Sequence, residues 1–501
     1  MAFQEGAGDS APPSTPPGFP PEDAEVGESV AGEPAGPSVL HQSERPDGPV
    51  VHEGTVDCSP LQLDEVIAAV YRSYPLLQGA YYSRNIAVGE QIAASGAFDL
   101  KLKGASENGP TGFYQTYRQS IGMAQPLQSG GEAFAGYRIG RGDFQPWYLE
   151  RQTNDGGEFK AGVLQPLLQG RDIDERRAAV WSAQYGRQLV EPEIQAQLIQ
   201  FVQEAGYAYW NWVAAGESYA IADRVLRLAE ERTDRIEAQV AADLIDPPEL
   251  TDNLRLIAER RAKLADARRK LDQSAAKLSL YLRDEAGQPI TPGSDCLPNL
   301  SEPSATDASV GTYDVARALQ QRPELKAIGW QQQIIQIESE QAANQLLPGL
   351  DGMISGSQDV GAPTSKKRDK SEFELEAGVY FDMPLQRRKA RGKLTALQGK
   401  LAQLSAKRRM VGDKIAVDVQ AASIAVDAAR VQVEQARDAV RLAEELADRE
   451  RTNQREGLSD LLKVTLREQY AAESAQKYVD ALLLYHLALV DLRAALGDDR
   501  P

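Results

Sequence analysis

The chain has 501 residues, 42% of them hydrophobic, and a formal net charge of −18. On length alone it would hold about three or four ordinary domains, so a chain of only two units would have to be elongated. No basic patch with interleaved aromatic residues is present, which argues against nucleic acid as a partner. No run of 18 apolar residues is present either, which excludes a transmembrane helix.

The first 57 residues differ in composition from the rest. They contain eleven acidic residues against Arg45 alone, so they account for −10 of the net charge (−11 + 1). Their run APPSTPPGFPPEDAE has too few large apolar residues to bury, and residues 1–57 are predicted to be a disordered, acidic, Pro-rich segment. Met1 is followed by Ala-Phe-Gln-Glu-Gly, with no basic or apolar run, so no secretory signal is predicted there.

The remaining chain contains an internal repeat. The stretches 73–102 and 321–350 share a pattern of Pro, Leu, a polar helix with a Glu, Ala and then strand-like residues. A constant offset of 248 residues relates Pro75 to Pro323, Leu77 to Leu325, Glu90 to Glu338 and Ala94 to Ala342, and Ala80 falls near Ala327. The repeat predicts a duplicated unit, at 58–295 and again at 296–498, followed by a tail at 499–501.

Each unit is predicted to begin with a helix, at about 63–97 and 315–347, with a proline near a helix start. Strand-like alternation follows in FDLKLKG, in FKAGVLQPL and, most regularly, in EFELEAGVYFDMP. In the last stretch one face is apolar and the other largely charged. The apolar face consists of Phe373, Leu375, Ala377, Val379, Phe381 and Met383.

The two units differ by an insert. Pro166 and Pro384, which follow the strands, are offset by only 218 residues, so the first unit carries 30 extra residues within 106–157. The insert is rich in glycine and aromatic residues, which leaves two interpretations open: an added hairpin with an interfacial aromatic girdle, or a long packed loop. The aromatic residues are Phe113, Tyr114, Tyr117, Phe134, Tyr137, Phe144, Trp147 and Tyr148.

Long helices follow the strands in both units. Residues 386–453 have almost no Gly or Pro, and apolar residues recur every three or four positions, which predicts a coiled-coil helix on the order of 100 Å long. A turn at REGLSDLL and a return helix to Leu496 complete the second unit. The first unit repeats this order, with a turn at 242–253 and a return helix ending near Leu282. Its descending helix is predicted to be kinked or broken near Pro192 and the cluster Tyr207, Tyr209, Trp210 and Trp212.

Strands with one apolar and one charged face are typical of the wall of a membrane β-barrel. One chain has too few strands to close such a barrel, so several chains would have to share it.

On these residues the chain resembles the TolC-type outer-membrane efflux proteins. The resemblance covers about residues 60–497 and is carried by RPELKA, ESEQAANQLLP, GVYFDMPLQRRKARGK and the stretch from REGLSDLL to RAALG. It implies a mainly helical homotrimer in which four strands per protomer close a twelve-stranded barrel in outer-membrane lipid. The helical hairpins would form a periplasmic tunnel that receives solutes from an inner-membrane pump through a periplasmic adaptor, for efflux or type I secretion.

The resemblance also implies a gate and adaptor surface at the hairpin tips. The residues concerned are Asp448, Gly457, Leu458, Ser459 and Asp460 at the second turn and Asp246, Pro247 and Pro248 at the first. The first turn lacks the glycine usual in the family. Acids facing a narrow tunnel would favour cations, whereas solvated faces of a coiled coil would explain the same residues without a gate.

No catalytic, cofactor or metal site is predicted. The three histidines, His41, His52 and His486, lack metal-ligand spacing, and no phosphate loop or nucleophile motif is present. Cys58 and Cys296 each precede one copy of the repeat, and whether they form a disulfide is open. Two alternatives remain: a periplasmic adaptor, against which the two hairpins argue, and a cytoplasmic coiled-coil scaffold, which would leave the two-faced strands unexplained.

Overall fold

The computed structural model describes residues 59–303, 315–364, 370 and 372–498. The chain divides into two units, 1–50 and 51–501, and every described residue belongs to the second. The segment predicted to be disordered, Cys58 and the tail 499–501 lie outside the described residues.

The described chain is mainly helical and repeats one order of elements. The first half contains α1 (Leu63–Ser73), α2 (Pro75–Ser95), α3 (Glu175–Ala241) and α4 (Pro247–Leu278). The second half contains α5 (Val315–Gln321), α6 (Pro323–Asn344), α7 (Arg388–Arg455) and α8 (Leu461–Leu496). Three short 3-10 helices add η1 (Gly96–Phe98), η2 (Pro146–Arg151) and η3 (Ser294–Cys296).

Prolines set the helix boundaries at equivalent places in the two halves. Pro75 and Pro323 each occupy the first turn of a helix, α2 and α6, so the single helices expected at 63–97 and 315–347 are each divided in two. A proline at this position loses no hydrogen bond and fits the helical φ.

Pro192 behaves differently from these two prolines. It is buried inside α3, which continues for 67 residues, so the predicted break is wrong. Packing of α3 against α2, α4, α6 and α8 keeps the backbone helical on both sides of the proline. At 1.5 Å per residue, α3 and the 68-residue α7 are each about 100 Å long, as expected.

The strands form one antiparallel sheet of six, in which each strand pairs with the next in sequence. They are β1 (Lys101–Gly109), β2 (Thr116–Pro126), β3 (Glu132–Gly142), β4 (Glu158–Pro166), β5 (Gly349–Asp359) and β6 (Glu374–Asp382). The expected four strands per chain is therefore wrong. The insert within 106–157 supplies the hairpin β2–β3, whose strands pair with each other and with β1 and β4 on either side.

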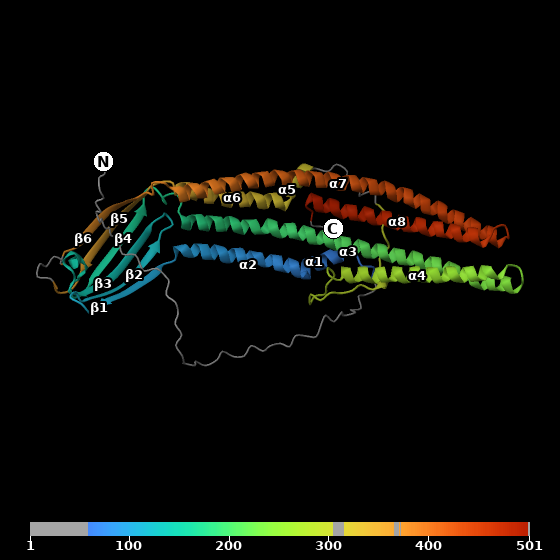
Figure 1. Cartoon of the computed structure of the whole chain (residues 1–501), viewed down its shortest axis with the longest axis horizontal. Coiled ribbons are helices and arrows are strands. Elements are labelled where there is room, and N and C mark those ends of the chain that lie inside the picture. The colour runs from blue at the N-terminus through green and yellow to red at the C-terminus, as the bar shows by residue number, and fades with distance from the viewer. Residues whose placement is uncertain (1–58, 304–314, 365–369, 371, 499–501) are drawn as a thin grey trace, which may run out of the picture. The chain divides into compact units, whose positions relative to one another are not determined.

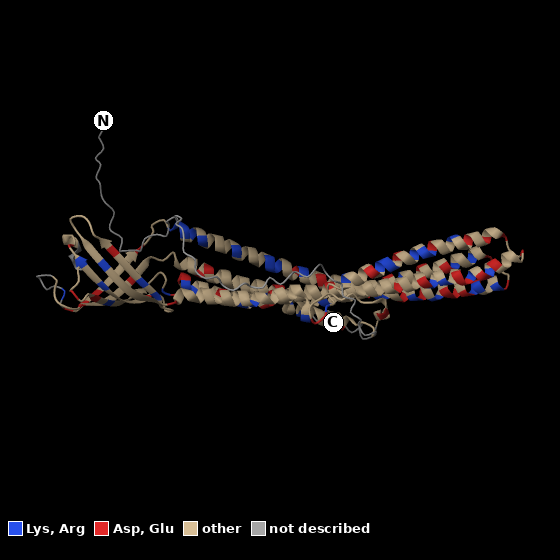
Figure 2. Cartoon of the chain, turned by 90° about the horizontal axis from the view of Figure 1, so that it is seen from below, with Lys and Arg blue, Asp and Glu red and all other residues tan. Residues whose placement is uncertain are grey.

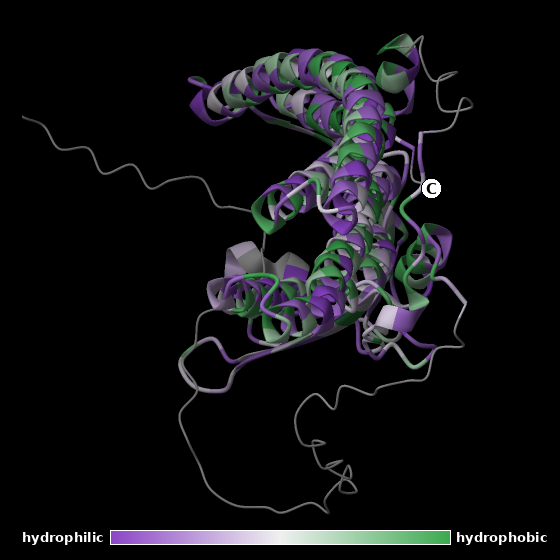
Figure 3. Cartoon of the chain, turned by 90° about the vertical axis from the view of Figure 1, so that its right-hand side faces the viewer, coloured by the Kyte–Doolittle hydropathy of each residue, from purple (hydrophilic) through white to green (hydrophobic). Residues whose placement is uncertain are grey.

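Within the unit of residues 51–501, the sheet lies at one end of the long helices and the two helix turns lie at the other (Figure 1). Helix α3 contacts α2 and α6 along one part of its length and α4 and α8 along another, and α7 contacts α6 and α8. Seen end-on, the helices follow an arc (Figure 3).

The two largest apolar clusters among the described residues pack the helices together. In the first, the fully buried Trp212 and Tyr209 of α3 pack against α1 and α4, and the Tyr209 hydroxyl donates a hydrogen bond to the Leu61 carbonyl at 2.9 Å. These aromatic residues therefore pack where α3 meets the shorter helix α1 and the return helix α4. In the second, alanines and valines of α7 face Tyr485 and Leu482 of α8, and the small side chains allow a close approach of the two helices.

Candidate functional site

The strongest candidate site is the sheet, whose two faces differ sharply. Successive side chains of a strand point to opposite faces, so the strand register fixes which residues share a face. One row of paired residues crosses all six strands and is entirely apolar: Leu102, Met123, Ala135, Ala161, Gly356 and Leu375. The next row continues this apolar face with Ile121, Tyr137 and Phe159.

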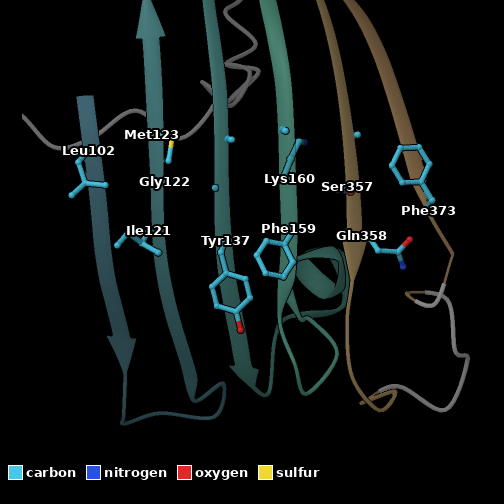
Figure 4. Close-up of a pocket in the computed structure, with 14 residues that line it drawn as sticks. Leu102, Ile121, Gly122, Met123, Tyr137, Phe159, Lys160, Ser357, Gln358 and Phe373 are labelled. Carbon is cyan, nitrogen blue, oxygen red and sulfur yellow. The ribbon is translucent and has the colours of Figure 1, made fainter. Parts of the chain in front are cut away.

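Large side chains on the apolar face are exposed. At least half of the surface of each of the following is accessible: Leu102, Ile121, Met123, Phe159, Ile354, Phe373, Leu375, Val379 and Phe381. The small residues Ala135 and Ala161 leave an open groove of about 570 Å³, beside which the rings of Tyr137 and Phe159 lie 4.8 Å apart (Figure 4). A contiguous apolar surface of this kind marks a contact with lipid or with another protein.

The opposite face carries cross-strand ion pairs. Arg118 of β2 pairs with Glu107 of β1 at 2.8 Å, and Lys160 of β4 pairs with Glu376 of β6 at 2.9 Å. Arg138 of β3 pairs with Glu158 of β4. Partly exposed pairs contribute little stability each, but together they keep this face charged and hydrated.

The sheet is joined to the helices by hydrogen bonds between side chains and backbone. The Gln125 side-chain amide donates to the Phe98 carbonyl at 2.6 Å, and the Asn344 side-chain oxygen accepts from the Gly170 amide at 2.7 Å. The Arg387 guanidinium donates to the Leu346 carbonyl at 2.8 Å. These contacts satisfy backbone groups where helix changes to strand, and they fix the sheet on the helix ends.

The second candidate site is the pair of turns at the other end of the helices. At the second turn, the Leu458 amide donates to the Asn453 carbonyl and the Gly457 amide to that of Gln454, which is a Schellman motif with Gly457 at φ +75°. The first turn has the same bonds, from Leu244 to Gln239 and from Asp243 to Val240, with Asp243 at φ +54°. An aspartate therefore occupies the left-handed position that Gly457 occupies in the second turn.

The structure assigns local roles to most of the predicted tip residues. Asp460 accepts the Lys463 amide at 2.8 Å and caps α8, whereas Asp246 precedes α4 without a capping bond and is followed by Pro247 and Pro248. Asp448 pairs with Arg451 one turn along α7, and Ser459 donates to Glu450. Gly457 supplies the turn, and the Leu458 side chain is 73% exposed.

Sequence reasoning missed the equivalent residues of the first turn, Asp243 and Leu244. Leu244 is 72% exposed, nearly the same as Leu458. Setting Asp243-Leu244-Ile245-Asp246 over Gly457-Leu458-Ser459-Asp460 gives the match. Each tip thus presents one exposed leucine between a left-handed residue and an aspartate.

A buried charge cluster, also missed, ties the two hairpins together. Glu468 of α8 lies 2.6 Å from Arg232 of α3 and 3.3 Å from Arg260 of α4, and the three side chains are at most 6% exposed. Arg260 also donates to the Val225 carbonyl at 2.7 Å, and burial lowers the pKa of its guanidinium. By contrast, charged residues are frequent on the helices toward the tips (Figure 2), and pairs such as Arg255–Glu259 there are exposed.

Other kinds of site are not found in the described part of the chain. No helix there is apolar over enough length to cross a membrane. Nor does any group of three His, Cys, Asp or Glu residues there have the arrangement needed to hold a metal ion. His486 is buried, stacks on Trp210 at 3.6 Å and lies 2.9 Å from the Ser301 carbonyl. His41, His52 and Cys58 lie outside the described residues, so the Cys58–Cys296 disulfide stays a hypothesis.

The comparisons with known proteins agree with this geometry. Residues 315–498 match the family model described as Outer membrane efflux protein. This part of the chain is similar to the outer membrane efflux protein family. The predicted resemblance is thereby confirmed, and the similarity to this family agrees with the expectation that the protein is not an enzyme. No match was found among curated protein sequences.

Solved structures of outer membrane proteins share the fold over both halves of the chain. The open-state MtrE outer membrane channel of Neisseria gonorrhoeae is 15% identical, with a TM-score of 0.62 over 91% of this chain and 98% of that one. The outer-membrane channel OprN is 12% identical, with a TM-score of 0.62 over 88% and 91%. VceC of Vibrio cholerae is 15% identical, with a TM-score of 0.60 over 87% and 96%.

Proposed function

We propose that this protein is the outer-membrane channel of an efflux or type I secretion assembly, a passive duct through which solutes leave the cell. The observation that carries the proposal is the six-stranded sheet, whose apolar face is exposed while its other face is charged. A single chain does not hide this apolar face among its own described residues, and membrane lipid would cover it.

Assembly of several copies is supported by two unpartnered surfaces. Among the described residues, β1 and β6 pair on one side only, which leaves two free strand edges. Along α7, the exposed residues Met410, Val417, Ile424 and Val431 recur at seven-residue intervals, the spacing of a coiled-coil seam. A homotrimer would pair β6 of one copy with β1 of the next and cover the α7 seam with a neighbouring helix.

The long hairpins would then line a tunnel in the periplasm, and their tips would face an adaptor and an inner-membrane pump. The tip residues named above support this role through their exposure: Leu244 and Leu458 offer apolar contacts at the ends of the two hairpins. The buried Arg232–Glu468–Arg260 cluster would hold the two hairpins of one chain together beneath those tips.

Fractionation and conductance test the proposal. Expressed with an export signal in a Gram-negative host, the protein should sediment with outer membranes and require detergent for extraction. The purified protein should then give discrete conductance steps in planar bilayers. A protein that stays soluble without detergent would instead be a scaffold or an adaptor, and the absence of conductance steps from membrane-inserted trimers would contradict a channel.

A further inference from the structure

We infer that the hairpin β2–β3 is part of the membrane wall, so that three copies close an eighteen-stranded barrel instead of the expected twelve-stranded one. The inference rests on the proposed function, which supplies the three copies and the lipid. Four lines of observation place the hairpin within the wall and not in a loop outside it.

The first is position within the sheet. Residues 101–109 of β1 pair with β2, and residues 158–164 of β4 pair with β3, so the hairpin lies between the two strands that the family pattern would place side by side. If the hairpin lay outside the wall, both of these ladders would have to break and β1 would have to pair directly with β4. The hairpin is therefore an interior part of the sheet.

The second is the alternation of side chains. On the apolar face the hairpin presents Ile121 and Met123 from β2 and Ala135 and Tyr137 from β3, in line with the neighbouring strands. Both of its strands are 11 residues long, and about 9–11 tilted residues cross a bilayer. A loop in water gains nothing from such a face.

The third is charge on the opposite face. Glu107 and Arg118 are direct partners in the β1–β2 register, and Arg138 and Glu158 are direct partners in the β3–β4 register. One opposite-charge pair therefore lies between the hairpin and β1 and another between the hairpin and β4, an arrangement that favours this register over others.

The fourth is the turn that joins β2 to β3, on the side of the sheet nearest the helices. The turn at 127–131 is closed by a hydrogen bond from the Leu127 amide to the Gly131 carbonyl, which also accepts from Arg176 near the start of α3 at 3.3 Å. Gly131 has φ +80°, and a Cβ at this position would collide with the Leu164 carbonyl. The hairpin thus ends level with β4, at the junction with the helices.

The consequence is a mismatch between the two parts of the channel. Each chain brings six strands to the junction but four long helices, α2, α3, α6 and α7, that reach it. Barrel diameter grows roughly in proportion to strand number, so eighteen strands give a barrel about 1.5 times as wide as twelve, and porins of 16–18 strands enclose an aqueous channel. The membrane end would then be a wide vestibule, and the helical tunnel would limit which solutes pass.

Spin labels can place the hairpin relative to lipid. Cysteines are introduced singly at Ile121 and Ser120 of the hairpin, and at Leu375 and Glu374 of β6 as matched references, in a full-length background with Cys58→Ser and Cys296→Ala. After reconstitution in liposomes, labels at 121 and 375 should be more accessible to oxygen than to a water-soluble nickel chelate. Labels at 120 and 374 should show the reverse order.

The two hypotheses fail differently in this experiment. If 375 and 374 alternate but 121 and 120 are both accessible to the nickel chelate, the hairpin lies outside the wall and the inference is overturned while the channel stands. If 375 is also inaccessible to lipid, the proposed function itself fails. Strand counting by electron cryomicroscopy of trimers in nanodiscs gives a second measure: eighteen strands in the natural chain, and twelve after deletion of 110–142, which lets β1 face β4.

Discussion

At the scale of single residues, the buried Arg232–Glu468–Arg260 cluster has the largest expected effect on stability. One carboxylate serves two guanidinium groups away from water, so its loss leaves two buried cations without a counter-charge. Breaking a buried pair in this way costs more than the net contribution of the intact pair.

We therefore predict that Glu468→Gln destabilises the protein by about 3–5 kcal/mol, seen as a clear fall in the melting temperature of the purified protein. The control is Glu444→Gln, because Glu444 forms an exposed pair with Arg224 at 3.9 Å that also joins the two hairpins. That variant should melt within experimental error of the natural protein. Equal effects of the two variants would show that burial is not the cause.

Gly457 offers a second test, of backbone conformation. Its positive φ at the end of α7 suits glycine, and open space surrounds the position where a Cβ would lie. Gly457→Ala should therefore destabilise the protein by about 1 kcal/mol through strain alone. Gly399, inside α7 with equally open surroundings, is the matched control: Gly399→Ala should stabilise by about 0.5–1 kcal/mol. Chemical denaturation in detergent measures both, and the same sign for both would contradict the explanation.

At the scale of elements, the two hairpin tips have the same backbone hydrogen-bond pattern but differ in the caps of the helices that follow. The second return helix, α8, has a side-chain cap from Asp460, whereas α4 starts from Asp246 and relies on Pro247 at its first position. The first turn of α8 should consequently depend on one carboxylate, and the first turn of α4 should not.

Asp460→Ala should speed amide exchange at residues 461–464 several-fold at pH 7, and Asp246→Ala should leave exchange at residues 249–250, the first amides after the two prolines, nearly unchanged. The hydrogen bond from the Lys463 amide lowers the pKa of Asp460 below its ordinary value of 3.8. The stabilisation is therefore complete above that ordinary value and is lost as the pH falls through the lowered one. Hydrogen exchange followed by mass spectrometry should show the Asp460→Ala effect shrinking in acid, and an effect that persists there would exclude the carboxylate cap.

Elements whose apolar residues recur at a regular strand or helix period could be predicted from the sequence. Elements in which this recurrence is interrupted could not. Strand β6 was predicted because Phe373 to Met383 alternate without exception, and α7 because its apolar residues recur at helical spacing. For the segment that forms the hairpin β2–β3, the sequence leaves both a hairpin and a packed loop open. Gln119 interrupts the apolar face of β2, and glycines such as Gly136 and Gly140 weaken the strand signal of β3.

The candidate sites divide in the same way. The tip at Gly457 could be found because glycine signals a helix end, but Asp243 carries no such signal. The cluster around Glu468 could not be predicted from the sequence. Its two arginines lie more than 200 residues away along the chain, on helices whose exposed faces carry many other charges. Only the packing of α3, α4 and α8 buries these three charged side chains and so distinguishes them from the exposed ones.

At the scale of the whole molecule, the exposed seam of α7 should decide whether copies associate. Ile424 is 69% exposed at the middle of the seam, and association would bury it against a neighbouring copy. Ile424→Asp should abolish or greatly weaken the trimer, because an unpaired carboxylate would be buried, whereas Ile424→Leu should retain it. Native mass spectrometry or sedimentation in detergent gives the subunit number, and an unchanged trimer in Ile424→Asp would place the interface elsewhere.

The position of β2–β3 inside the sheet has a consequence for how such proteins can evolve. A hairpin adds two strands at once, so β4 keeps its direction and the outer strands β1 and β6 keep their edges. A single added strand would instead reverse every later strand and misdirect the following helix. In the proposed channel, the pore circumference could therefore grow in pairs of strands without any change in the strand edges that would join one copy to the next.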